Sequence, residues 1–378
     1  MAFRRLSLKL RLSSRCQLLR APFETEQYLK PLLYEVELAC RKAGPAPQPT
    51  KEQSMNLPCL GIDIAKVKFN VCLLQLSGKL KHKVFANNAA GFAQLQEWLE
   101  KHEVLQVHAC LEATGTYGEA LSHYLQDRGH TVSVMNPAAI KAFAASRLSR
   151  TKTDRVDAEL IARFCLAHQP PPWTPPAPEV RELQALVRRL ESLIEMRVAE
   201  ENRLSAGITV AVVRSSVEEM IAHLKDQITR TEKLIRQHID KHPGLKQQNE
   251  LLNSIPGISD TTAAVLLAEV PDFKLYRSAR QVAAFAGLVP RERQSGSSVK
   301  GRVRLSKIGN SRLRKALYFP AITALRCSPF FQQWAEGLRQ KGKSKMSVIG
   351  AVMRKLIHIA YGVLKSGRPF DPEIAKSA

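Results

Sequence analysis

Apolar and polar positions alternate in several short segments of the first half of the chain. Residues 60–76 are rich in Val, Ile, Phe and Leu and predict one strand with a bend at 65–66, and residues 79–87 predict its hairpin partner. The pattern continues with a helix over 91–102, a strand over 104–111, a helix over 117–128, a strand over 131–135, and a mostly helical segment over 138–167 that a polar stretch interrupts at 146–153. Strands that alternate with helices are typical of an α/β layer fold.

Residues 169–179 are dense in proline, which excludes a helix or a central strand and predicts a stiff, extended linker. Beyond it, apolar residues recur at helical spacing from Val180 to about 204, and a break is expected at 205–207. Ser216 and Glu219 have the spacing of a capping box, so a second amphipathic helix is expected from there until Pro243. Two long charged helices with narrow apolar seams predict a coiled-coil arm that can also pair between subunits.

The last third of the chain is predicted to be mainly helical. Residues 254–270 resemble a helix-hairpin-helix element, in which the turn at Gly257 directs backbone N–H groups at a phosphate. An ordinary Pro-Gly turn before a core helix is the alternative, and the pattern leaves both open. A short helix is expected over 281–288, and longer ones, with basic residues on their polar sides, over 311–326 and 346–364.

These patterns divide the chain into six parts. They are a poorly ordered extension over 1–54, an α/β catalytic domain over 55–168, the linker over 169–179, the helical arm over 180–243, a mainly helical domain over 250–366 and a tail over 367–378. The first 23 residues are rich in Arg, Ser and Leu and lack acids, as organelle transit peptides do. We favour the other interpretation, an upstream extension of a protein whose working part begins near Met55.

The charge balance indicates a polyanionic partner. Lys and Arg number 57 against 34 Asp and Glu, which gives a net charge of +23 and favours nucleic acid over an anionic membrane surface. No apolar run approaches the roughly 20 residues that span a bilayer, so no membrane partner is expected. The seven cysteines are scattered without metal-site spacing and predict reduced, mostly buried thiols. We expect a cytoplasmic, nucleoid-associated bacterial protein.

Four acids in the first half of the chain have the positions that phosphodiester chemistry needs. Asp63 lies inside the first strand between apolar neighbours, and Glu112 follows the strand at 104–111. Asp154 and Asp157 are three residues apart and share one helix face. Converging carboxylates can hold Mg²⁺ or Mn²⁺, which orients a nucleophile and offsets charge on a leaving oxygen. One acid on the first strand, one at the end of a later strand and a helical pair form the arrangement of ribonuclease-H-like nucleases.

Each acid also has a simpler explanation. Asp154 and Asp157 favour a helix N-terminus through the helix dipole, and Glu112 can be a polar strand end. Asp63 is harder to explain in this way, because an acid among apolar neighbours is costly unless it is liganded or solvated. Glu119 and Glu159 remain possible substitutes in the set.

A basic tract lies in the last third of the chain. Between residues 291 and 315 there is one acid, Glu292, and the basic residues are Arg291, Arg293, Lys300, Arg302, Arg304, Lys307, Arg312, Arg314 and Lys315. Such a density of cations predicts contacts with nucleic-acid phosphates, and a solvated basic loop is the alternative. Serines lie within the tract at 295, 297, 298 and 306, and no sequence rule alone selects a nucleophile among them.

Several motifs resemble one family. GIDIAK, LEATGTYG and TKTDRVDAELIARF, then IPGISDTTAAVLLAEV, FAGLVPRERQSGSSVKGRVRLSKIGN and LRKALY, look like the DEDD transposases of the bacterial IS110 family, particularly its IS1111 subgroup, which are related to the Piv invertases. The resemblance covers about 55 to 369 and places the family's acidic quartet at Asp63, Glu112, Asp154 and Asp157. It implies a RuvC-like ribonuclease-H domain, a coiled-coil arm and a C-terminal transposase domain.

The resemblance also implies a mechanism and partners. A serine attacks the DNA backbone and holds it as a phosphoserine during strand exchange, and by its place in PRERQSG this serine resembles Ser295. A structured bridge RNA pairs with donor and target DNA, and the subunits assemble as dimers and then tetramers. The expected function is therefore a DNA transposase or recombinase. The alternatives are a Holliday-junction-type nuclease that uses the acids with water, and a non-enzymatic nucleic-acid-binding protein.

Overall fold

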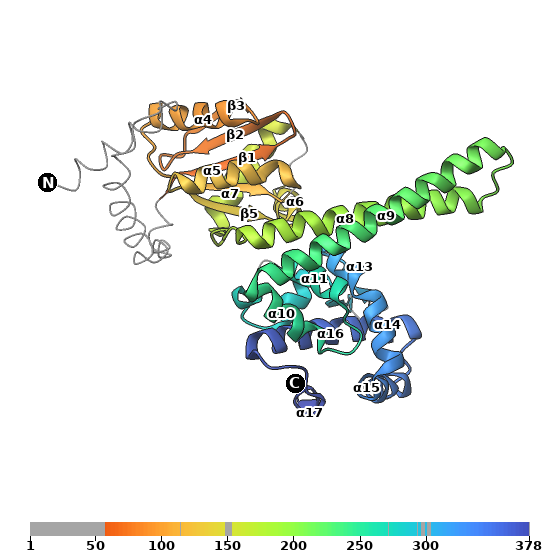
Figure 1. The fold of residues 1–378 in the computed structure, drawn as a ribbon. Coiled ribbons are helices and arrows are strands. Elements are labelled where there is room, and N and C mark those ends of the chain that lie inside the picture. The colour runs from red at the N-terminus through yellow and green to blue at the C-terminus, as the bar shows by residue number, and fades with distance from the viewer. Residues whose placement is uncertain are drawn as a thin grey trace, which may run out of the picture. The chain divides into compact units, whose positions relative to one another are not determined.

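The structure is a computed structural model that describes residues 57–113, 115–147, 153–270, 272–292, 294–295, 299–300 and 304–377, with the backbone alone at 116, 294–295, 299–300 and 375–377. The predicted extension over 1–54 lies outside the described residues. The chain divides into two compact units (Figure 1). The first takes the chain up to Met135 together with Arg147–Pro171, and the second takes Asn136–Ser146 and Pro172–Ala378.

The first unit is built on a mixed sheet of five strands. Its order is β3-β2-β1-β4-β5, in which β1 to β3 are antiparallel neighbours and β4 and β5 run parallel to β1. The strands are β1 (Cys59–Ile64), β2 (Lys68–Leu74), β3 (Leu80–Ala86), β4 (His108–Glu112) and β5 (Thr131–Met135), and the helices are α4 (Ala89–Lys101), α5 (Glu119–Asp127) and α7 (Asp154–His168), with a short 3₁₀ turn η1 (Thr116–Gly118) before α5. The expected α/β class of this part is confirmed.

The prediction of one bent strand over 60–76 is wrong. The chain reverses between β1 and β2, where the Ala65 N–H donates to the Lys68 carbonyl at 2.9 Å, and β1 pairs with β2 from Cys59↔Leu74 to Ile64↔Phe69. Both strands are buried, so the apolar alternation continues across a short exposed turn. Strand β3 then pairs with β2.

The helices cover the two faces of the sheet. Phe69 of β2 contacts the ring of Phe92 on α4, and Phe92 contacts Tyr124 on α5, so these two helices share one face. Helix α7 covers the other face and lies directly on β1. A side chain at Gly61 would meet the Ala158 carbonyl oxygen of α7 at 2.1 Å, so only glycine permits this approach.

Replacing Gly61 by Ala should therefore displace α7 or strain β1. We expect the free energy of unfolding to fall by about 1–3 kcal/mol, as for other overpacked core sites. Urea denaturation of the full chain measures it. The matched control is Gly337→Ala, because nothing lies within 4 Å of a side chain there. Equal stability of the two variants would contradict the close approach of α7 to β1.

The second unit begins with two long antiparallel helices, α8 (Pro178–Ser205) and α9 (Ala211–Lys241) (Figure 1). Leu183, Val187, Leu190 and Leu193 of α8 are buried along the predicted apolar seam. The break falls where it was expected, at Gly207 with φ +92. The prediction that a capping box at Ser216 starts the second helix is wrong. Helix α9 begins at Ala211, so Ser216 lies inside it.

Helix α16 (Lys345–Ser366) is the central core helix of the rest of this unit. The elements that pack against it are α10 (Pro243–Asn253), η2 (Phe273–Leu275), α12 (Ala279–Phe285), α14 (Tyr318–Cys327) and α15 (Pro329–Gln340). The unit also contains α11 (Asp260–Glu269), α13 (Ser311–Ala316) and α17 (Pro372–Ser377). Sequence reasoning missed α10 and α15, and it joined α13 to α14, which separate at Leu317. By length and composition α16 could cross a membrane. However, 56% of its apolar stretch is buried inside the protein, as in a core helix.

The basic tract forms short antiparallel ribbons that the sequence did not predict. β6 (Pro290–Arg291) pairs with β9 (Arg304–Leu305), and β7 (Gln294–Ser295) pairs with β8 (Val299–Lys300). A side chain at Gly350 of α16 would lie 3.2 Å from Leu305, so β9 rests on the N-terminal part of that helix.

Candidate active site and basic tract

The first two predicted acids lie side by side. Strand β1 is parallel to β4 with Gly61 opposite Cys110 and Ile62 opposite Leu111, so Asp63 and Glu112 are the next pair at the carboxyl ends of the two strands. Side chains alternate along a strand, and Gly61 faces α7, so Asp63 faces α7 as well. Both acids are half-buried. The sheet therefore presents two adjacent carboxylates on its α7 face.

The first turn of α7 brings the third acid to strand β2, beside β1. Thr153 caps this helix by accepting from the Val156 N–H at 3.3 Å. Asp154 accepts a hydrogen bond from Asn70 Nδ2 at 3.3 Å, and Asn70 is the β2 residue paired with Asp63. Asp154 thus lies above the strand pair that carries Asp63. Asp157, one turn further along α7, is half-buried.

Lys68 forms an ion pair with Asp154 and favours its charged form. Its Nζ lies 3.2 Å from Asp154 Oδ2, and its hydrogen bond and charge lower the pKa of Asp154 below the usual value, with Asn70 acting in the same direction. Asp154 is therefore ionised at neutral pH. Of the two possible substitutes, Glu159 on α7 pairs with Arg163 at 2.8 Å and Glu119 begins α5 on the opposite face, and their part in the set stays a prediction.

Mg²⁺ and Mn²⁺ prefer oxygen ligands, so the four predicted carboxylates have the right chemistry for such an ion. Within the described ranges, no three His, Cys, Asp or Glu side chains are arranged as a metal site. Lys68 and Asn70 already engage one oxygen of Asp154. Metal binding by Asp154 would therefore use its other oxygen, Oδ1, or replace these contacts.

Buried thiols lie beneath the acids on the same face of the sheet. Cys59, Cys72, Cys110 and Cys165 are free and buried, as predicted, whereas Cys327 is exposed and Cys16 and Cys40 lie outside the described residues. Burial raises the pKa of Cys72 to about 12. These thiols are packing residues in the layer between β1, β4 and α7.

The basic tract is only partly described. Arg291 and Arg304 are exposed and paired in register across β6 and β9, and Lys307 is exposed with φ +58. Ser295 and Lys300 are placed by their backbone in β7 and β8. The remaining predicted positions, which are Arg293, Arg302, Ser297 and Ser298, lie outside the described residues.

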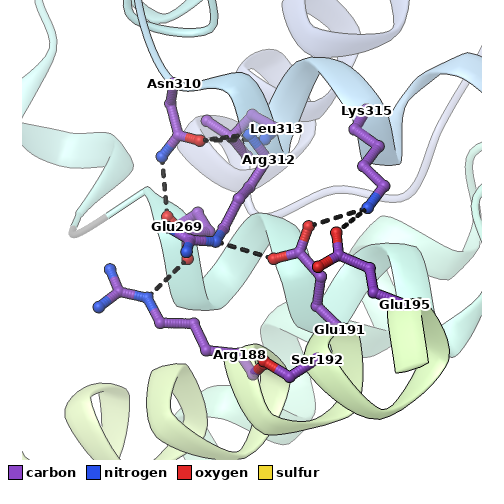
Figure 2. A network of polar contacts seen from close by, with 9 residues as sticks. All are labelled: Arg188, Glu191, Ser192, Glu195, Glu269, Asn310, Arg312, Leu313 and Lys315. Carbon is purple, nitrogen blue, oxygen red and sulfur yellow. Dashed lines mark hydrogen bonds and ion pairs between the residues drawn. The ribbon is translucent and has the colours of Figure 1, made fainter. Parts of the chain in front are cut away.

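Three other cations of the tract contact groups of the protein itself, and Figure 2 shows two of them, Arg312 and Lys315. Arg312 Nε lies 2.8 Å from Glu191 Oε2, and Lys315 Nζ lies 2.7 Å from Glu195 Oε1. Arg314 donates to the Ala286 carbonyl at 3.3 Å. Sequence reasoning missed these partners because they are far away along the chain. A nucleic-acid role for the three cations stays a prediction, and phosphates would have to compete with these contacts.

A buried carboxylate holds the end of the tract. The Glu269 side chain is 3% exposed, lies 3.2 Å from Arg188 Nε and accepts from Asn310 Nδ2 at 2.8 Å (Figure 2). Asn310 Oδ1 in turn accepts from the Arg312 and Leu313 N–H groups and caps α13. This network fixes the point where the tract enters α13.

The turn at Gly257 has a packing role. It has φ +92, and a side chain there would meet the Pro320 carbonyl oxygen of α14 at 2.4 Å. The turn between α10 and α11 thus requires glycine for its packing. This fits the simpler of the two interpretations, an ordinary Pro-Gly turn before a core helix. Phosphate binding by this turn stays a prediction.

Comparisons with known proteins decide the family. A transposase domain model matches residues 60–213, and a model described as "Transposase IS116/IS110/IS902 family" matches 249–335. The chain is 38% identical over 323 residues to the "Pilin gene-inverting protein" of Moraxella bovis, covering 85% of this chain and 99% of that protein. The chain belongs to the IS110 family.

Other IS110-type relatives are more distant. The chain is 25% identical to the "Transposase for insertion sequence element IS1328" of Yersinia enterocolitica, over 84% of this chain and 99% of that protein. It is 24% identical to the "Transposase for insertion sequence element IS1111A" of Coxiella burnetii, over 72% and 79%. The acidic quartet lies within the first matched segment, and Gly257 and the basic tract lie within the second. Membership in this family of transposases and DNA invertases indicates an enzyme that cuts and rejoins DNA.

Proposed function

We propose that this IS110-family protein is a transposase or recombinase that cuts DNA with a metal-dependent acidic quartet and rejoins it through a serine. The observation that carries the proposal is the adjacency of Asp63 and Glu112 on parallel strands, with Asp154 held above them through Asn70. The strand order β3-β2-β1-β4-β5 supports a ribonuclease-H-like, RuvC-like fold for this unit.

The residues divide the chemistry between them. Asp63, Glu112, Asp154 and Asp157 would hold Mg²⁺ or Mn²⁺, which, when bound, offsets negative charge on the leaving oxygen. The Ser295 hydroxyl gives up its proton as its oxygen forms a bond to phosphorus and the DNA P–O bond breaks. The released DNA oxygen takes up a proton and becomes a hydroxyl. In rejoining, a DNA hydroxyl attacks the phosphoserine and returns Ser295 to its free form. Arg291 and Arg304, exposed beside the strand that carries Ser295, would stabilise the phosphate charge.

Two partners belong to this proposal. The net charge of +23 supports binding of a structured guide RNA as well as donor and target DNA. Pairing of subunits through a coiled-coil arm is supported by exposed apolar side chains near the loop between α8 and α9, which are Met196, Val198, Val210, Val212, Val213 and Met220.

Ser295→Ala should abolish both the covalent protein–DNA adduct and recombination, because no other group takes over the bond to phosphorus. The full chain would be incubated with Mg²⁺, RNA transcribed from the DNA flanking the gene, and labelled DNA that carries those flanks. Labelled DNA retained on the protein in a denaturing gel measures the adduct.

The matched control is Ser306→Ala in the same tract, which should retain the adduct. DNA breakage at the parent's rate by Ser295→Ala, with no adduct from either protein, would favour the junction-type nuclease that uses water. Binding without any Mg²⁺-dependent breakage would favour the non-enzymatic protein.

A further inference from the structure

Helix α16 carries a strip of basic side chains on the one side that the core leaves partly open. Arg354, Lys355 and His358 are half-buried, whereas Val352, Met353, Leu356 and Ile357 between them are buried. Residues 354 and 358 are one helical turn apart, so their side chains are neighbours. Helix α12, which packs against α16, adds the exposed Arg280.

Neither guanidinium in this cluster is neutralised. Arg280 and Arg354 form no ion pair within the part of the chain that the structure describes, in contrast to Arg312 and Lys315. Neither α12 nor α16 contains an Asp or Glu. Uncompensated cations on facing helices repel one another unless an anion lies between them.

His358 adds a directional group to these charges. Its Nε2 atom is buried and has no hydrogen-bond partner in the described structure. Burial lowers the pKa of His358, and the charges of Arg354, Lys355 and Arg280 lower it further. A buried polar nitrogen without a partner is costly. Because Nε2 is closed to solvent, an anionic oxygen reaches it only when a neighbouring side chain moves.

The strip continues from the basic tract. Gly350 lies one turn before Arg354 on the same side of α16 and contacts Leu305 of β9. Arg304, the exposed neighbour of Leu305, has no ion pair among the described residues either. The basic tract and the strip on α16 therefore approach each other at Leu305 and Gly350.

We propose that Arg280, Arg354 and His358, together with Lys355, bind backbone phosphates of the nucleic acid on which this protein acts. The inference rests on the proposed function for the choice of ligand, because a nucleic-acid backbone supplies phosphates at regular spacing along the ribbon and α16. Guanidinium groups bind phosphate oxygens in a bidentate manner, and the imidazole Nε2–H donates to a third oxygen once a neighbouring side chain moves aside. The site is distinct from the acidic quartet and needs no metal.

The test is the salt dependence of binding by Arg280→Gln/Arg354→Gln in the full chain, without Mg²⁺. The probes are a mixed-sequence DNA duplex and a single-stranded RNA, each titrated over a range of salt concentrations. Loss of two phosphate contacts should make the slope of log K against log salt shallower by about 2 for the duplex and somewhat less for the single strand. Binding should weaken to a similar extent for different sequences of the same probe.

The matched control is Lys341→Gln/Lys343→Gln, which removes the same charge from exposed positions in the same unit. Its slope should equal the parent's. A change with only one probe identifies DNA or RNA as the source of the phosphates, and an unchanged slope with both probes overturns the proposal. The single variant Arg280→Gln, at an exposed position, should change the slope by about 1 and keeps the test decisive if the double variant folds poorly.

The two proposals fail independently. The Asp63→Asn variant should bind both probes with the parent's salt dependence, because the strip does not involve the acids. If no DNA breakage is ever observed while the strip variants change the slope, the phosphate site stands and the strand-transfer proposal does not.

Discussion

Asp63→Asn should reduce Mg²⁺-dependent DNA cleavage by at least about a thousandfold while leaving the fold intact, since metal assistance contributes several kcal/mol to such reactions. The amide has almost the shape of the carboxylate but lacks the charge that holds a divalent cation beside Glu112. Cleavage of labelled DNA by the full chain, compared at equal protein concentration, measures the loss.

Two further measurements separate a lost metal ligand from a damaged fold. The thermal midpoint in EDTA should match the parent's, whereas added Mn²⁺ should raise the midpoint of the parent alone, because a ligand stabilises only the protein that binds it. Glu119→Gln, on the opposite face of the sheet, is the matched control and should cleave as the parent does. Cleavage by Asp63→Asn close to that of this control would exclude Asp63 from the catalytic centre.

The first unit was largely predictable because its signals are local. Alternation along β1 and β4 placed Asp63 and Glu112 on strands, and helical spacing placed Asp154 and Asp157 on one face of α7. The same alternation concealed the turn at 65–67, because β1 and β2 are both buried and the apolar pattern does not reveal the reversal. The sequence also could not reveal Lys68 and Asn70 as partners of Asp154, since β-register and helix docking bring them together across 84 residues in the case of Asn70.

The second unit was less predictable because its polar partners are distant along the chain. The sequence identified a dense basic tract, but only the folded chain separates the cations paired with acids of α8 from those without an ion pair among the described residues. Charge counts treat Arg304 and Arg312 alike, although Arg312 is paired with Glu191 and Arg304 is not paired among the described residues. Density of charge therefore predicted the partner class, and the residues that contact the partner stay a prediction.

Glu269→Ala should destabilise the second unit by about 3–5 kcal/mol, the range for removing one member of a buried ion pair. The side chain of Glu269 is 3% exposed, and its loss leaves Arg188 and the Asn310 amide without their acceptor. Arg188 is 30% exposed, so water compensates it in part and the lower end of the range is expected. Asn310 also caps α13, so the entry of the basic tract into that helix should loosen. Urea denaturation of the full chain measures the change.

Two variants distinguish this network from surface pairing. Glu195→Ala removes an acid whose side chain is 61% exposed and should change the free energy of unfolding by less than about 1 kcal/mol, although it breaks a 2.7 Å contact with Lys315. Glu269→Gln retains an acceptor for Asn310 but loses the charge opposite Arg188, so its stability should fall between those of Glu269→Ala and the parent. If Glu269→Ala were no less stable than Glu195→Ala, the buried carboxylate would not be what holds α11, α8 and the start of α13 together.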